Sequence, residues 1–167
     1  QVERVVILSP DKDLAQCVTG DRVVLIDRLR KKTFDQRGVE EKFGVAPASI
    51  PDWLALVGDD ADGIPGAPKW GKKSAAALLS AYGDIDQIPD DERTWKIAIR
   101  GASALGASLR EHRSVLPLYR TLATLRRDVP LVEDLAALEW RRPDPVAIEA
   151  LSTELGDEGL IKLVQAM

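Results

Sequence analysis

The sequence predicts an α/β fold in which a parallel sheet is followed by an all-helical portion. Two short runs of β-branched and aliphatic residues, Val5–Leu8 and Val23–Ile26, are typical of strands buried in a parallel sheet. From Gly38 onward, apolar residues recur mostly at helical spacing. The chain has 167 residues, of which 45% are hydrophobic and 30% charged, as in a soluble globular protein long enough to bury a core.

Composition excludes several classes of protein. The net charge of −4 argues against a uniformly basic surface but permits a local basic patch. The single Cys17 cannot form an internal disulfide, and we interpret it as a small hydrophobic residue. No apolar run approaches the roughly 18 residues of a membrane span, and no signal-peptide pattern opens the chain. We therefore expect a cytoplasmic protein without membrane contact.

The start of the chain is abrupt. It begins with Gln1 and reaches the first strand almost at once, which is typical of a segment of a longer protein. We therefore expect an upstream portion of the same protein to complete the fold.

Acidic residues follow the first strand directly. Asp11 and Asp13 lie where open α/β sheets place their ligands, and at this spacing they could converge on one cation. The alternative is that either acid caps a short helix, Leu14–Val18. After the second strand, four basic residues cluster within Arg28–Lys32, which we interpret as a solvated strand end or loop, with phosphate contact as the less favoured alternative.

The rest of the chain predicts helices separated by glycine and proline. Gly44 and Gly83 suit the left-handed stop of a helix, whereas Pro51 and Pro117 suit a first turn. The expected helices are Gly38–Phe43, a helix that begins at Ser49 or Pro51 and ends at Val57, Lys72–Tyr82, Arg93–Arg100, Gly101–His112, Val115–Leu125, Val146–Leu155 and Leu160–Val164.

A second acidic pair follows the helix that ends at Val57. Asp59 and Asp62 can face the same side of a turn, while Asp60 points elsewhere. Carboxylate oxygens are the ligands that hard divalent cations such as Mg²⁺ prefer. Together with the acids after the first strand, they suit a site in which two metal ions, about 3.5–4 Å apart, clamp the oxygens of a phosphodiester displacement.

A glycine-rich turn and a basic helix start follow this acidic pair. Glycine allows the backbone to approach a phosphate closely, and a helix N-terminus directs free N–H groups toward it. Such contacts hold a nucleic-acid backbone without reading its sequence. The alternative is a plain packing corner with three exposed lysines. The candidate phosphate-binding residues are Gly66, Lys69, Gly71, Lys72, Lys73 and Ser74.

Four segments together resemble a known family. They are VVILSPDKDLAQCV, FDQRGVEEKFGVAPASIPDWLALVGDDADGIPG, PKWGKKSAAALLSAYG and RGASALGASLREHRSVLPLYRTLATLRRDVPL. Between Val5 and Leu131, their acids, glycines and apolar positions agree in order and spacing with the 5′-3′ exonuclease and flap endonuclease family. This family includes the 5′-nuclease domains of bacterial type-A DNA polymerases.

The resemblance implies a function and an organisation. Residues 1–57 resemble the C-terminal part of a parallel-sheet, PIN-like nuclease core with its connecting helix, and residues 58–131 resemble a helix-three-turn-helix DNA-binding region with its following helices. Beyond the resemblance, we expect residues 132–167 to form a C-terminal helical extension. The implied activity is metal-dependent hydrolysis of DNA near 5′ ends and flaps, in replication and repair, by a monomer. The implied catalytic metal ligands, for two Mg²⁺ or Mn²⁺ ions, are Asp11, Asp13, Asp59 and Asp62.

The same resemblance implies a potassium ion at the Gly66–Gly71 hairpin, where this chain departs from the family with Lys69 and Trp70. We interpret Trp70 as a packing residue and expect Lys69 to alter or partly replace the site of this ion. The family's leading aspartate, helical arch and upstream acidic cluster precede the segment that matches Val5, so we expect weak or no cleavage by this chain alone. The alternative function is a DNA-structure binding module that grips duplex without cutting.

Overall fold

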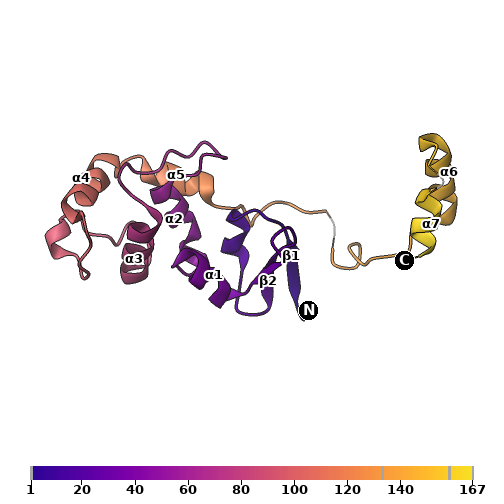
Figure 1. Cartoon of the computed structure of the whole chain (residues 1–167), viewed down its shortest axis with the longest axis horizontal. Helices are drawn as coiled ribbons and strands as arrows, with labels where there is room; N and C mark the ends of the chain where they lie inside the picture. Colours follow the sequence, from indigo (N-terminus) through magenta and orange to yellow (C-terminus); the bar gives the residue numbers. More distant parts are fainter. Residues whose placement is uncertain (1, 133, 158, 167) are drawn as a thin grey trace. The chain divides into compact units, whose positions relative to one another are not determined.

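The computed structural model describes residues 2–132, 134–157 and 159–166. The chain divides into two compact units, Gln1–Arg127 and Asp128–Met167. The first unit holds a three-stranded sheet and helices α1 to α5, and the second holds α6 and α7 (Figure 1). This mixed α/β architecture, rich in helix, agrees with the fold class that the sequence predicts.

The sheet has the strand order β1-β2-β3. β1 (Val5–Leu8) pairs in parallel with β2 (Val23–Asp27), which confirms the expected parallel arrangement. β2 then pairs antiparallel with β3 (Lys32–Phe34), a strand that the sequence analysis assigns only to a strand end or loop. The connection turns sharply at Lys31, which adopts a left-handed φ of 53°.

β1 is more exposed than expected. The sequence predicts a strand covered on both faces, but the side chains of Val5, Val6 and Leu8 are 37, 46 and 61% exposed. Within the described ranges, β2 is the one strand that pairs with β1. The prediction of full burial is therefore wrong for β1, whereas β2 buries Val24 and Leu25.

The connection between the first two strands contains a short 3-10 helix, η1 (Asp13–Cys17), in place of the expected helix Leu14–Val18. After β3, α1 (Gln36–Phe43) begins where the Asp35 carboxylate accepts a hydrogen bond from the Gly38 N–H, at 2.7 Å. It ends at Gly44, whose φ of 74° confirms the expected left-handed stop.

Helix α2 (Ile50–Val57) is the centre of the core. It follows a short 3-10 helix, η2 (Pro47–Ser49), and its residues from Ile50 to Leu56 are all buried. In Figure 1 it lies between α1 and α3 (Lys72–Tyr82), and it contacts α3 and α5 (Leu116–Ala123). The loop between α2 and α3 is therefore anchored at both ends by packed helices.

The expected helix Arg93–Arg100 is wrong. Only a 3-10 turn, η3 (Glu92–Thr94), forms in this region, and the chain then continues without regular structure to α4 (Ala102–His112). The indole of Trp95 is buried, and its Nε1 donates to the main-chain oxygen of Pro89 at 2.8 Å. This contact folds the segment back on itself, so burial of one large ring overrides helix propensity.

Trp70 confirms its expected packing role. Its side chain is 5% exposed, its ring lies 6.4 Å from that of Trp95, and its Nε1 donates to the main-chain oxygen of Leu105 at 3.3 Å. The loop before α3 is thereby attached to α4.

The second unit contains α6 (Pro145–Leu155), which Asp144 caps through the Val146 N–H at 2.9 Å, and α7 (Gly159–Gln165). Both agree with the helices expected there. Among the described residues, no helix combines the length and apolarity that a membrane span requires.

Candidate functional site

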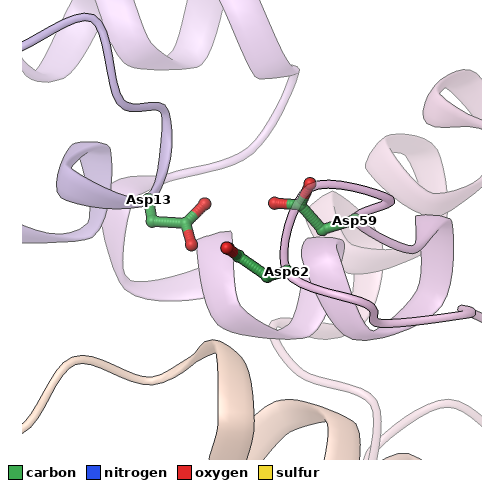
Figure 2. A group of neighbouring side chains, drawn as sticks. All are labelled: Asp13, Asp59 and Asp62. Atoms are coloured by element: carbon green, nitrogen blue, oxygen red, sulfur yellow. The ribbon is translucent and has the colours of Figure 1, made fainter.

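Three carboxylates from two distant segments converge. Asp13 opens η1, and Asp59 and Asp62 lie in the turn after α2; each offers an oxygen within 4.8 Å of the others. Figure 2 shows the three side chains pointing toward one another. Asp13 and Asp59 are only 8 and 5% exposed, whereas Asp62 is open to solvent. The two acidic segments that the sequence singles out, after the first strand and after α2, thus meet at one place through these three residues.

The turn that carries Asp59 is held by its own backbone. The Asp59 N–H donates to the Ile64 oxygen at 2.7 Å, and the Ile64 N–H donates back at 2.9 Å. Gly66 then passes against the end of α2 with a φ of 71°, and a Cβ added there would lie 2.5 Å from the Gly58 nitrogen. Only glycine fits this close approach, so Gly66 positions the acidic turn.

Asp13 is positioned by Gln16. The Gln16 Nε2 donates to the main-chain oxygens of Asp13, at 2.9 Å, and Ala123, at 3.0 Å, while its Oε1 accepts from the Leu125 N–H at 2.9 Å. Arg127 also donates to the Gln16 main-chain oxygen at 3.1 Å. The end of α5 therefore braces the segment that presents Asp13.

Crowding of the acids alters their charge. Burial is the largest of the effects that raise the pKa of the Asp13 carboxyl to about 6, followed by the charge of Asp11 and a side-chain hydrogen bond with Asp62. Lys12 acts in the opposite direction, and its ammonium group forms an ion pair with Asp59 Oδ2. The chain thus supplies one cation of its own to a cluster that favours positive charge.

These residues fit a divalent cation. Asp13 Oδ1 is buried and has no hydrogen-bond partner among the described residues, an arrangement that costs stability unless a cation or proton satisfies it. Closely spaced carboxylates are the oxygen ligands that Mg²⁺ and Mn²⁺ take. Asp13, Asp59 and Asp62 would hold such an ion.

Asp11 lies beside this group rather than in it. Its Oδ1 accepts a hydrogen bond from the Asp13 N–H at 3.0 Å, and its side chain is exposed. This contact with a nearby backbone N–H is typical of a capping residue, which is the alternative to metal binding for either acid. Asp60 is exposed and is not one of the three convergent acids, in line with the expectation that it points elsewhere.

The candidate phosphate-binding residues surround the start of α3. Lys69, Lys72 and Lys73 are exposed, and Lys69 adopts a left-handed φ of 73° that is unusual for a residue with a side chain. The Ser74 hydroxyl donates to the Gly71 oxygen at 3.1 Å and accepts from the Gly71 N–H at 3.3 Å. The hydroxyl therefore stabilises the helix start, and the first N–H groups of α3, as in any helix, have no intrahelical acceptor.

Two residues of the site escaped the sequence analysis. Lys12 could have been identified, because it stands between Asp11 and Asp13 in the sequence and must therefore lie close to the acidic cluster. No signal could have identified Gln16, because Ala123 and Leu125, two of its partners, lie more than a hundred residues away along the chain.

Comparison with known proteins identifies the family of the chain. The family model described as 5′-3′ exonuclease, C-terminal SAM fold, matches residues 45–146. The chain is 40% identical over 159 residues to DNA polymerase I of Pseudomonas aeruginosa, with 90% of this chain and 17% of that protein covered. It is 35% identical over 162 residues to the 5′-3′ exonuclease of Aquifex aeolicus, with 96% of this chain and 52% of that protein covered.

Solved structures share the fold. A structure of T5 5′-exonuclease with bound zinc ions superposes with a TM-score of 0.61 at 19% identity, covering 98% of this chain and 53% of that one. A DNA complex of the T5 flap endonuclease superposes with a TM-score of 0.58 at 19% identity, covering 98% and 52%. The chain thus spans about half of these neighbours and a smaller part of the polymerase. With a family model that matches most of its length, the chain belongs to the 5′-3′ exonuclease family.

Proposed function

We propose that the protein is a structure-specific 5′ nuclease, which hydrolyses DNA phosphodiester bonds near 5′ ends and flaps with two Mg²⁺ or Mn²⁺ ions. The observation that carries this proposal is the convergence of Asp13, Asp59 and Asp62 in a chain of this family. Buried carboxylates without a cation would repel both each other and the phosphates of DNA. A bound metal ion reverses that effect.

The acids are proposed to act as metal ligands, with Asp11 as the fourth member at the edge of the site. When bound, such ions activate water and neutralise the charge that develops on the attacked phosphate. The chain's own contribution is to hold the ligands in place, through the acidic turn on one side and Gln16 on the other. Lys12 neutralises Asp59 in the metal-free protein and must share that carboxylate once an ion binds.

The hairpin Gly66–Gly71 and α3 are proposed as a helix-three-turn-helix grip on the duplex backbone. Exposed lysines and the N-terminus of α3 offer charge and N–H donors to phosphates. A potassium ion at the hairpin would bind main-chain oxygens. Two main-chain oxygens of the hairpin already accept hydrogen bonds from serine hydroxyls: Pro68 from Ser108, at 2.5 Å, and Gly71 from Ser74.

We also propose the division of labour that the resemblance implies. Residues 1–57 form the end of the nuclease core, residues 58–131 the DNA-binding region, and residues 132–167 a helical extension. Three convergent carboxylates are few for two ions, so further ligands come from another segment, and the exposed β1 offers an edge against which such a segment could pair. The 167 residues alone should bind metal and DNA but cleave weakly.

The metal centre is tested with the double variant Asp59→Asn and Asp62→Asn, and Asp60→Asn is the matched control from the same turn. Calorimetric titration with Mn²⁺ should show binding to the wild type and to the control but not to the double variant. In the natural protein that contains these residues, the double variant should lose cleavage of 5′-flap DNA while retaining DNA binding. Equal cleavage by the double variant would falsify the metal assignment.

The alternative is a DNA-structure binding module that does not cut. It predicts DNA binding that is unaffected by Mg²⁺ or Mn²⁺, and no cleavage even by the natural protein. The buried pair Asp13 and Asp59 favours the nuclease, since a pure binder gains nothing from carboxylates close to phosphate.

A further inference from the structure

A groove of about 1100 Å³ extends from the candidate metal centre across the first unit. It is larger than the roughly 300–1,000 Å³ typical of small-molecule pockets. Asp11, Asp59 and Asp60 line one part of it, and Lys72 at the start of α3 lines another. The groove therefore connects the acidic cluster with the proposed backbone grip.

Three other residues that line the groove are basic. Arg30 and Lys32, from the β2–β3 hairpin, and Lys42, from α1, all line it and are exposed. Arg30 is balanced by Asp27, with 2.7 Å between the guanidinium and the carboxylate. The Lys42 ammonium lies over the Phe34 ring, 4.3 Å from its centroid.

The three cations are close enough to affect one another. Burial lowers the pKa of the Lys42 ammonium, and the charges of Arg30 and Lys32 lower it further. Asp27 opposes this effect, and Glu41, the other acid at this end of the groove, pairs with Arg37 at 2.9 Å. A local excess of positive charge remains on a chain whose net charge is −4.

The floor of the groove identifies the part of a ligand that can bind. Phe34, Phe43 and Trp53 line it, but they are only 8, 9 and 3% exposed. Rings covered to this extent offer no face on which a base could stack, unlike the aromatic platforms of proteins that bind single strands. Charged side chains around a covered floor suit the sugar-phosphate backbone instead.

We propose that the basic end of this groove, formed by Arg30, Lys32 and Lys42, is a second phosphate-binding site for the DNA strand whose backbone meets the metal centre. The inference rests on the proposed function for the identity of the strand. The sequence favours a solvated role for the basic residues of the β2–β3 hairpin, whereas this proposal favours the alternative, phosphate contact. The strand would then contact cations of the hairpin and α1 as well as the start of α3.

Two charge-matched double variants test the site. Lys32→Gln with Lys42→Gln removes two cations from the groove, whereas Arg28→Gln with Lys31→Gln removes two exposed cations of the β2–β3 hairpin that do not line it. Binding of a fluorescent DNA hairpin with a 5′ single-stranded tail is measured by anisotropy, in EDTA, between 20 and 300 mM salt. Lys72→Gln serves as the reference for the grip at α3.

The groove variant should bind about tenfold more weakly at 0.1 M salt, and the magnitude of its log–log salt slope should fall by about 1.4, two contacts of about 0.7 each for a single strand. The control pair should resemble the wild type. Lys32→Arg with Lys42→Arg should restore affinity, which distinguishes lost charge from misfolding.

Equal weakening by both pairs would reveal a general effect of net charge and overturn the proposal. Wild-type affinity in the groove variant, with weaker binding by Lys72→Gln, would also overturn it while leaving the proposed nuclease function intact. Failure of the wild type to bind this DNA at any salt concentration would contradict both. Weaker binding confined to the groove variant would support the site even if the Mn²⁺ titration shows no metal binding.

Discussion

Replacing Asp13 by Asn tests the electrostatics of the metal-free acidic cluster. Burial, the charge of Asp11 and a hydrogen bond with Asp62 raise the pKa of the Asp13 carboxyl from the ordinary 3.8 to about 6. The folded state therefore binds a proton more tightly than the unfolded state, so wild-type stability falls as the pH rises through that interval and stays lower above it. Asn keeps the shape of the protonated acid and carries no charge, so the variant should escape this loss.

At 1.36 kcal/mol per pKa unit, the full difference corresponds to about 3 kcal/mol. Solvent reaches the cluster beside Asp62 and screens part of this electrostatic effect. The free energy of unfolding of Asp13→Asn should therefore exceed that of the wild type by about 1.5–3 kcal/mol near neutral pH and by almost nothing at pH 4.

The assay is urea denaturation in EDTA from pH 4 to 8, with Asp60→Asn as the control from the same acidic region. Added Mg²⁺ should stabilise the wild type and the control more than Asp13→Asn. The ion neutralises the crowded carboxylates, and the variant has lost one of the carboxylates that would bind it. A stability difference between Asp13→Asn and the wild type that does not change with pH would refute the reasoning.

Three further substitutions probe neighbouring features by denaturation. Lys12→Met should destabilise the metal-free protein by about 1–3 kcal/mol because Asp59 loses its counter-charge, and most of that loss should disappear in Mg²⁺; equal losses in both conditions would contradict a shared role for the ion and Lys12. Lys69→Gly should stabilise the fold by about 0.5–1 kcal/mol because glycine adopts the left-handed backbone freely, and an unchanged midpoint would argue against strain there. Gly66→Ala should cost about 3 kcal/mol, since the added Cβ would meet the Gly58 backbone, and it should abolish stabilisation by Mg²⁺; retained stabilisation would show that the acidic turn does not depend on this contact.

The acidic cluster was largely predictable because each of its two segments carries a local signal. Asp59 and Asp62 occupy one turn, whose spacing is visible in the sequence, and Asp13 follows a strand whose end has a known place in α/β sheets. Asp11 was the uncertain member, since a short acid near a helix start can satisfy a neighbouring N–H instead of joining the cluster. Its hydrogen bond with the Asp13 N–H is of that kind.

Features set by distant partners were not predictable. The apolar run of β1 is the same whether or not other strands cover it, so its exposure could not be foreseen. The helical pattern at Arg93–Arg100 gave no sign that Trp95 would turn back to Pro89. Lys32 and Lys42 line one groove only because a hairpin and a helix meet, and their sequence separation hides this.

The contacts of Gln16 have a consequence for how the protein folds. Its amide joins the segment that carries Asp13 to Ala123 and Leu125, so these contacts form only when a loop of more than one hundred residues closes. Closing so long a loop has a large entropic cost. The same segment also packs against α2 and η2, which lie much nearer to it along the chain. We therefore expect the brace from the end of α5 to be added to a segment that already contacts α2.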